Sequence, residues 1–167
     1  LLGRYLVEKA AQATAGGFAI VDIAQDLQLK TMVAIKWFRE RARAEHEAAM
    51  LRRLGGAHVV SFVDFLEGIE PHAGYPYGVA MGAGTMSLLQ MLRTRAYKVS
   101  PAEVIALTIG LLSGIGHVHA NGFVHCDIKP GNSVIRGDGS LALVDFDTTT
   151  PIGGRVSAYT TWYGGCA

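Results

Sequence analysis

The sequence predicts an α+β fold in which a five-stranded antiparallel sheet with one inserted helix precedes the beginning of a mainly helical region. The first half of the 167-residue chain carries strand-like apolar segments, whereas an apolar helical pattern dominates residues 101–121. A polar cluster, FVHCDIKPGN at residues 123–132, follows that helix directly. The hydrophobic content of 50% is enough to bury the core of one domain or of two small lobes.

Five segments of the first half have the composition of β-strands. Residues 5–10 and 18–24 flank turn-compatible residues that include Gly16 and Gly17, and this arrangement predicts a hairpin. Paired glycines let backbone amides approach a phosphate closely, although a plain hairpin turn gives the same pattern. The other predicted strands are residues 32–38, 59–67 and 75–81.

Lys36 lies in a predicted strand with two apolar faces. By alternation it shares one face with Ala34 and Phe38, and the other face is also apolar. A lysine in such a place usually extends its ammonium group to water. It becomes a candidate for chemistry only if a buried acid lies nearby.

The helix predicted over residues 39–54 offers such an acid. Glu47 lies on one stripe with Leu51 and Leu54, which follow it at helical spacing. A carboxylate on an inward face needs a cation or a hydrogen-bond partner, because burying it alone is costly. Lys36 is the obvious partner, but a place at the edge of the stripe, in water, explains the pattern equally well.

Two helices are predicted in the second half of the chain, over residues 87–95 and 101–121. Ser100 and Glu103 have the spacing of a capping box, and Pro101 occupies the first helical position. These signals mark the start of an ordinary helix.

The apolar character of residues 104–126, which include no Asp, Glu, Lys or Arg, raises the question of a membrane span. Three histidines, at positions 117, 119 and 125, would then lie in or beside the hydrocarbon. We therefore expect a buried core helix and no membrane span.

The polar cluster at residues 123–132 holds side chains that can converge on a ligand. Asp127 and Asn132 lie five positions apart in a loop that contains Pro and Gly. A hairpin predicted over residues 133–144 then delivers the acidic triplet DFD at residues 145–147. Because hard divalent cations prefer carboxylate and amide oxygens, the pattern predicts a base beside a metal site.

The charge balance gives no sign of a nucleic-acid or anionic-lipid partner, since 15 basic residues face 14 acidic ones and the net charge is +1. Arg39, Arg41 and Arg43 alternate with glutamates and predict a solvated helix face. Cys126 and Cys166 match neither a metal-binding spacing nor a disulfide framework, which favours a reducing, intracellular location, cytoplasmic or nuclear. The chain opens on Leu without a signal peptide, and we expect it to be an excerpt of a longer product.

Four motifs in this order resemble the eukaryotic-type protein kinase domain. They are VAIK at residues 33–36, Glu47 in an EAAMLRRL helix, HCDIKPGN at residues 125–132 and DFD at residues 145–147. The resemblance covers nearly the whole chain, and four motifs in order are far more specific than any one of them. It implies ATP and Mg²⁺ as cofactors and a protein substrate phosphorylated on Ser or Thr.

The resemblance divides the chain into an N-lobe at residues 1–81, a hinge at 82–86 and a partial C-lobe at 87–167. Residues 148–167 resemble an activation segment. The helices that follow this segment in the family are absent, so we expect the excerpt alone to be inactive.

The resemblance also assigns roles at the reacting centre. Asp127 would orient the substrate hydroxyl or accept its proton, and Lys129 would neutralise the transferring phosphate. Asn132 and Asp145 would bind magnesium. A lysine two places after the catalytic aspartate favours a protein Ser/Thr substrate over Tyr or a small molecule.

The nucleotide would be held mainly by the first lobe. Lys36 would hold the α- and β-phosphates and would be oriented by Glu47. The other cofactor-binding residues that the resemblance implies are Gly16 and Gly17 over the nucleotide, Val21 and Ala34 against adenine, Met81 and Ala83 at the hinge, and Val134.

The chain departs from the family pattern at three places. The glycine-rich loop keeps Gly16 but has Thr14 and Ala19 at its outer positions. Cys126 replaces the arginine that reads a phosphorylated activation loop. Asp147 replaces the glycine of the metal-binding triplet. These departures define the alternative: a pseudokinase, or a truncated nucleotide-binding or scaffold module without catalysis.

Overall fold

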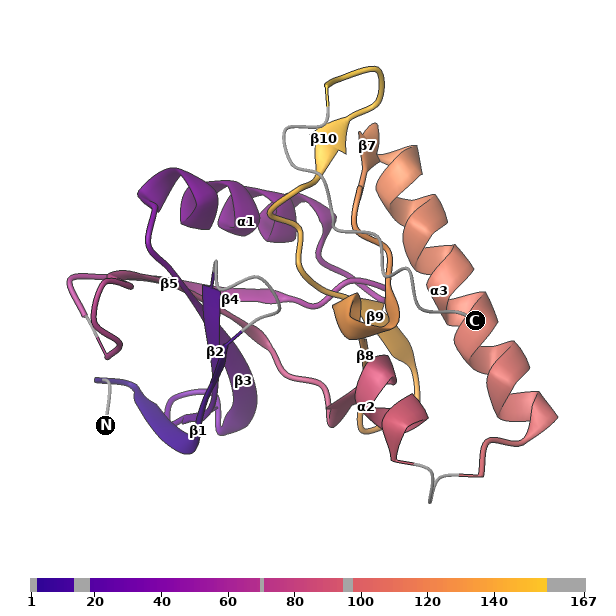
Figure 1. Cartoon of the computed structure of the whole chain (residues 1–167), viewed down its shortest axis with the longest axis horizontal. Coiled ribbons are helices and arrows are strands. Elements are labelled where there is room, and N and C mark those ends of the chain that lie inside the picture. The colour runs from indigo at the N-terminus through magenta and orange to yellow at the C-terminus, as the bar shows by residue number, and fades with distance from the viewer. Residues whose placement is uncertain (1–2, 14–18, 70, 95–97, 156–167) are drawn as a thin grey trace.

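The computed structural model describes residues 3–13, 19–69, 71–94 and 98–155 (Figure 1). A β-sheet with one helix beside it forms the first half, and a long helix flanks the second half on the side away from that sheet. Gly16 and Gly17, the predicted phosphate cover, lie outside the described residues.

The predicted five-stranded antiparallel sheet is confirmed. Its strands lie in the order β1-β2-β3-β5-β4, and each neighbouring pair is antiparallel. The strands are β1 (Tyr5–Ala13), β2 (Ala19–Asp26), β3 (Thr31–Phe38), β4 (Phe62–Glu67) and β5 (Tyr77–Gly82). β4 begins three residues later than predicted because Val59 instead bridges Gly56 and Leu143, which ties this segment to the second half.

The two faces of β3 enter different cores, as their alternation predicts. Val33, Ile35 and Trp37 are buried in one cluster on the outer face of the sheet. Phe38 belongs to the other cluster, against which Ala34 also packs. This second cluster lies on the face that carries Lys36 and α1.

The inserted helix, α1 (Arg41–Leu54), buries Glu47 together with Ala44, Ala48, Leu51 and Leu54. The predicted stripe therefore faces inward, and Glu47 is part of it. The helix ends at Gly55, where a Cβ would lie 2.7 Å from Leu51 O. A side chain does not fit there without a backbone shift.

The second half contains short strands around two helices. Its elements are β6 (Met86–Ser87), α2 (Leu88–Arg93), α3 (Pro101–Ala120), β7 (Phe123–Val124), the 3-10 turn η1 (Pro130–Asn132), β8 (Ser133–Ile135), β9 (Leu141–Leu143) and β10 (Thr150–Pro151). β6, β8 and β9 form one small sheet, and β10 pairs with β7. The predicted hairpin is β8 and β9.

The two halves share one continuous core. Leu51 and Leu54 of α1 belong to the same buried cluster as Val118 of α3 and Leu143 of β9. His117 on α3 adds a polar link, because its Nε2 donates to Leu54 O at 2.9 Å. These contacts fix α1 relative to the loop that follows α3.

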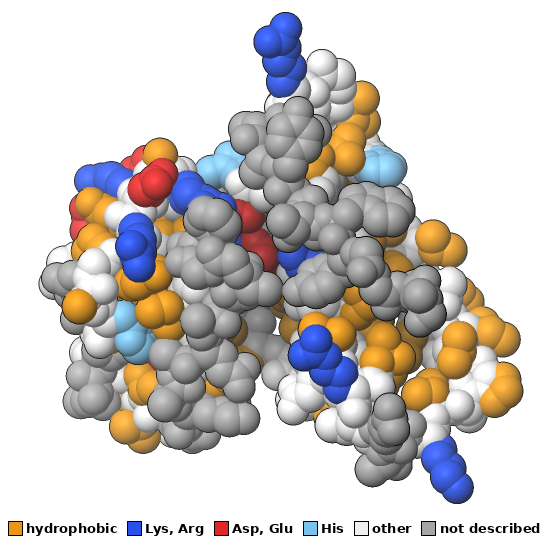
Figure 2. All heavy atoms as spheres, viewed as in Figure 1, with side chains coloured by type: hydrophobic (Ala, Val, Ile, Leu, Met, Phe, Trp, Pro, Cys, Tyr) orange, Lys and Arg blue, Asp and Glu red, His pale blue; other side chains and the backbone are white. Residues whose placement is uncertain are grey.

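The start of α3 is as predicted, whereas its burial is not. Ser100 and Glu103 make both bonds of the capping box, with Pro101 in the first turn. The prediction of a buried core helix was wrong, because within the described residues α3 buries only Gly114 and Val118. Figure 2 shows hydrophobic side chains gathered on the surface of α3, and these include Val104, Ile105, Ile109 and Leu112.

The length and composition of α3 also satisfy the criteria for a membrane-spanning helix, the only one to do so in the described part of the chain. Its 20 residues have a mean hydropathy of 1.4 over the most apolar window, and 11% of that window is buried. Length and composition alone are weak evidence for a span, and the helix packs one side against β7 and β9.

Candidate active site

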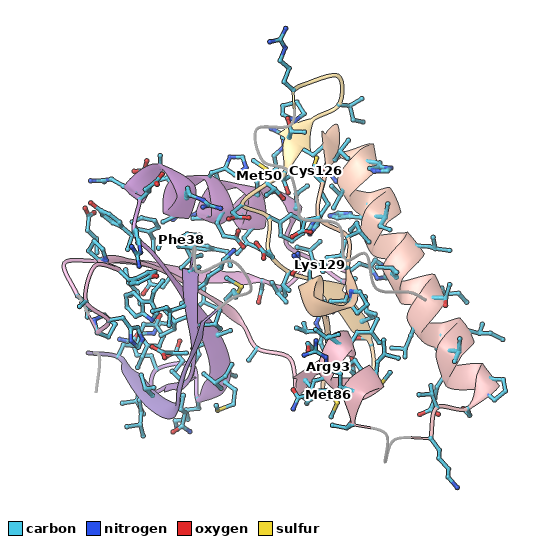
Figure 3. All side chains as sticks on the ribbon, viewed as in Figure 1. Phe38, Met50, Met86, Arg93, Cys126 and Lys129 are labelled. Atoms are coloured by element: carbon cyan, nitrogen blue, oxygen red, sulfur yellow. The ribbon has the colours of Figure 1, made fainter. Side chains whose placement is uncertain are left out.

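In the loop between β7 and β8, two polar side chains donate to one carboxylate oxygen of a third. Lys129 Nζ donates to Asp127 Oδ2 at 2.7 Å, and Asn132 Nδ2 donates to the same oxygen at 2.7 Å. Asn132 Nδ2 also bonds the backbone carbonyl of Asp127 at 3.0 Å. Figure 3 shows Lys129 on this loop, between the sheet and α3. The predicted convergence of Asp127 and Asn132 is thus present.

His125 links this loop to the backbone that follows β9. Its Nε2 donates to Val144 O at 3.0 Å, and its Nδ1 accepts from Asp127 N at 3.3 Å. The imidazole packs on Phe146 with ring centroids 4.7 Å apart, so His125 supports the loop structurally. Burial lowers the pKa of His125, so the ring is neutral near pH 7 and can accept at Nδ1.

Cys126 and Asp145 hold the backbone in a conformation that side chains disfavour. Their φ angles are +66° and +69°, in the left-handed region that glycine ordinarily occupies. Such backbone persists only where the surrounding contacts determine it, and it is frequent at functional sites. Here one left-handed residue directly precedes Asp127 and the other opens the 145–147 triplet.

The second group of polar side chains is a buried ion-pair chain. Lys36 Nζ lies 3.4 Å from Glu47 Oε2 and 2.6 Å from Asp145 Oδ1. The Lys36 side chain is 7% exposed and that of Glu47 is 0% exposed. Of the two interpretations of Glu47, the pairing with Lys36 holds and the solvated position does not.

Burial and the mutual attraction of Lys36, Glu47 and Asp145 together determine the pKa values of these three side chains. Burial disfavours the Lys36 ammonium, but the carboxylates of Glu47 and Asp145 outweigh it and raise the pKa of Lys36. Burial raises the pKa of Glu47, although Lys36 opposes it. Burial favours the neutral form of Asp145, but the Lys36 ammonium outweighs this effect and lowers the pKa of Asp145 to about 2. Lys36 is therefore held as a cation between two acids.

Asp147 adds a third carboxylate to this group. One oxygen from each of Glu47, Asp145 and Asp147 lies within 4.8 Å of the others. Asp147 pairs with Arg43 of α1, whose side chain is 30% exposed. The prediction of a solvated face was therefore wrong for Arg43. A signal existed in its spacing, since it precedes Glu47 by four residues and shares its helix face.

The predicted magnesium ligands lie on neighbouring backbone. Val144 N donates to Asn132 O at 3.1 Å, which places Asn132 beside the residue before Asp145. Asn132 uses its amide nitrogen for Asp127, so its amide oxygen remains for a cation. Asp145 accepts from Lys36 at Oδ1, and its side chain also contacts that of Asp147. The donor set, one amide and one carboxylate oxygen, suits Mg²⁺.

The predicted adenine contacts share the Lys36 face of the sheet. Val21 pairs with Lys36 across β2 and β3, and Ala34 pairs with Met81 across β3 and β5. Cross-strand partners point to the same side, and Ala34 and Lys36 are two residues apart. These side chains therefore lie on one surface.

The segment after β5 lies close to β3 and β8. Val134 packs against the same core cluster as Ala34. Ala83 N donates to Met32 O at 3.4 Å, a long bond that ties the predicted hinge to β3. Gly84 passes so close to Val134 that a Cβ would lie 2.6 Å from the Val134 Cβ.

Fold and site together define a two-part α+β domain with a buried lysine and carboxylate chain facing a loop aspartate. The chain belongs to the protein kinase domain family, which matches residues 8–165. The match covers the sheet, α1, the loop of Asp127 and the DFD triplet.

Curated relatives agree with this family. The chain is 30% identical over 146 residues to a probable serine/threonine-protein kinase of Streptomyces coelicolor, covering 83% of this chain and 22% of the relative. It is 30% identical over 151 residues to serine/threonine-protein kinase PknL of Mycobacterium tuberculosis, covering 86% of this chain and 36% of the relative. The chain thus spans well under half the length of either relative.

Among solved structures, the yeast RNA polymerase II CTD kinase CTDK-1 complex contains a chain of similar fold. The superposition has a TM-score of 0.71 and covers 88% of this chain and 46% of that chain. Because the sequences are 20% identical, this likeness bears on the fold alone.

Proposed function

We propose that the protein containing this chain transfers the terminal phosphoryl group of ATP, with Mg²⁺, to Ser and Thr hydroxyls of protein substrates. The observation that supports this best is the convergence of Lys129 Nζ and Asn132 Nδ2 on Asp127 Oδ2. Two donors on one oxygen hold the carboxylate in a fixed orientation, which is what a group that positions a nucleophile requires.

Asp127 is the proposed acceptor for the substrate hydroxyl. Its Oδ2 is occupied by Lys129 and Asn132, while its Oδ1 makes no hydrogen bond to any residue that the structure describes. A Ser or Thr hydroxyl can donate to Oδ1, and its proton can pass there as the oxygen becomes bonded to phosphorus. The Asp127 side chain is 10% exposed, so substrate can reach it.

Lys36 and Lys129 are the proposed positive charges of the site. Lys36, held between Glu47 and Asp145, would bind nucleotide phosphates, and Lys129 would lie beside the transferred group. Asn132 would hold the metal through its amide oxygen, and Asp145 would hold it through its carboxylate. ATP would supply the phosphoryl group, whose bond to ADP breaks as ADP leaves, and Mg²⁺ would neutralise phosphate charge.

The proposed substrate class rests on the relatives and on one residue. The relatives above are named serine/threonine-protein kinases, and DIKPGN places Lys129 two residues after Asp127, as in the Ser/Thr kinases that the chain resembles.

We further propose an intracellular location, cytoplasmic or nuclear, and no nucleic-acid partner. In this proposal residues 1–81 form the N-lobe, residues 82–86 form the hinge and residues 87–167 form a partial C-lobe.

The proposal is tested by measuring radiolabel transfer from ATP to a generic Ser/Thr protein substrate, with the full-length protein that contains this chain as the enzyme. We expect Asp127→Asn to lower kcat by roughly 10³-fold, because it removes the proton acceptor while preserving the shape of the side chain. Asp138→Asn, in the exposed turn of the β8–β9 hairpin, is the matched control and should leave kcat unchanged. Equal transfer by wild type and Asp127→Asn would refute the proposal.

Asp147 and Cys126 keep a second function open, nucleotide binding without transfer, because both replace residues of the family pattern. A thermal shift with Mg²⁺·ATP separates the two functions, since a ligand of the folded state raises stability by RT ln(1 + [L]/Kd). A shift without radiolabel transfer would identify a binding module. Transfer would exclude it.

A further inference from the structure

Two polar links attach α1 to the segment that follows β9, residues 145–149. Arg43 pairs with Asp147, and His46 Nε2 donates to Thr149 O at 2.9 Å. Arg43, His46 and Glu47 occupy positions i, i+3 and i+4, so they lie on one face of α1. This face therefore meets both Lys36, through Glu47, and the segment that carries Asp145.

Apolar packing joins the same elements, because Phe146 belongs to the buried cluster that contains Ala48 and Leu51 of α1. Beside Arg43 and His46 this packing is incomplete. A hollow of about 320 Å³ lies between α1 and the chain beyond Asp145, and the residues around it include Ala42, Arg43, His46, Asp147 and Pro151. Polar contacts therefore bridge a space that side chains leave incompletely filled. At this place the polar contacts add to the packing of Phe146 in holding α1 against the segment 145–149.

The charges explain why Asp147 needs Arg43. One carboxylate oxygen from each of Glu47, Asp145 and Asp147 lies within 4.8 Å of the others. Lys36 forms ion pairs with Glu47 and Asp145. The Asp147 side chain is only 10% exposed. Arg43 supplies the second cation. A glycine in place of Asp147 would need no such partner and could form no such link.

We propose that Asp147 is a positioning residue whose ion pair with Arg43 holds α1, and with it Glu47, in register with Asp145. The pair closes a ring: Arg43 and Glu47 sit on one helix, Asp145 and Asp147 on one segment, and Lys36 bridges Glu47 and Asp145. The expected effect of this ion pair on catalysis rests on the proposed phosphoryl transfer. Its expected effect on the stability of α1 does not.

The first experiment is a double-mutant cycle on transfer by the full-length protein, with Arg43→Gln, Asp147→Asn and the double variant. Each single change should lower kcat roughly tenfold with little effect on KM for the protein substrate. The double variant should be no worse than the single ones, and Asp147→Glu should recover most of the loss. Losses that multiply in the double variant, or no loss in either single variant, would overturn the proposal.

The second experiment does not require activity. Hydrogen exchange of the α1 amides should become several-fold faster in Arg43→Gln and in Asp147→Asn, because the helix loses a link to residues 145–149. Arg41→Gln is the matched control, since Arg41 lies on the same helix but pairs with Glu45 and Glu67. Unchanged exchange in both test variants, or equal acceleration in Arg41→Gln, would overturn the proposal.

The two experiments separate this proposal from the proposed function. If wild type transfers no phosphate but the α1 amides respond as expected, the function fails and the link between α1 and the segment 145–149 stands. If wild type transfers phosphate and the two variants behave as wild type in both assays, the link fails and the function stands.

Discussion

Lys36 Nζ lies 2.6 Å from Asp145 Oδ1, although 109 residues separate the two in the chain. The bond joins the middle strand of the sheet to the backbone that leaves β9. The same ammonium group lies 3.4 Å from Glu47 Oε2 on α1. Three separate elements thus depend on one buried cation for their charge balance.

Replacement of Lys36 should destabilise the fold as well as remove activity. In Lys36→Met, Glu47 stays fully buried without its cation, which should cost about 3 kcal/mol in the free energy of unfolding. Adding Glu47→Leu should return part of this stability while activity stays absent, because the buried charge is gone but the phosphate contact is not restored. Urea denaturation and radiolabel transfer measure the two effects. A single variant as stable as wild type would contradict the assigned burial.

Replacement of Lys129 should affect transfer with little effect on stability. Lys129 is 26% exposed at its side chain and contacts Asp127 Oδ2, and after its removal this oxygen keeps the hydrogen bond from Asn132. Lys129→Ala should lower kcat by roughly 10²-fold while the thermal midpoint stays near that of wild type. Lys98→Ala, an exposed lysine before α3, serves as the control. Equal losses in the two variants would argue against a direct role.

Local patterns were sufficient to predict the sheet, the two faces of β3 and the start of α3. Strand alternation distinguishes Ala34, Lys36 and Phe38 from their neighbours, and the Ser100 capping box is a local signal. Burial of α3 could not be predicted this way. Periodicity and hydropathy report that a helix is apolar, but they do not report what covers it.

The ion pairs of the site could not be established from local sequence patterns alone. The spacing of Glu47 placed it on an inward stripe, yet whether a strand lysine reaches it depends on how α1 crosses β3. Arg43 and Asp147 are 104 residues apart, and the segment that carries Asp147 begins at Asp145 with a left-handed φ, which sequence statistics assign to glycine. Strained backbone at a site is where propensity fails.

The close approach of Gly84 to Val134 should make the linker between β5 and β6 intolerant of a side chain. A Cβ at Gly84 would lie 2.6 Å from the Val134 Cβ and 2.9 Å from the backbone Ile135 O, so the linker must shift. Gly84→Ala should cost about 1–3 kcal/mol in unfolding free energy and weaken the thermal shift given by Mg²⁺·ATP. Gly137→Ala, where a Cβ meets nothing within 4 Å, should do neither. Two variants with the same small effect would exclude steric crowding at Gly84.

The pH dependence of stability should reveal the Arg4–Asp26 ion pair at the end of the β1–β2 hairpin. Arg4 Nε donates to Asp26 Oδ1 at 2.8 Å, and the Gln28 and Leu29 amides donate to the same oxygen. These donors, Arg4 first, lower the pKa of Asp26 from 3.8 to about 2. Because the folded pKa is the lower one, the carboxylate contributes its full stability above about pH 5, and this contribution is lost as the pH falls toward 2. The difference in unfolding free energy between wild type and Asp26→Asn should therefore be constant from about pH 7 to 5 and shrink below it. Arg4→Gln should show a smaller change over the same range, since the main cause of the low pKa is removed. Denaturant titrations across these pH values measure both, and a difference that stays constant down to about pH 3 would show that Asp26 titrates alike in the folded and unfolded chain.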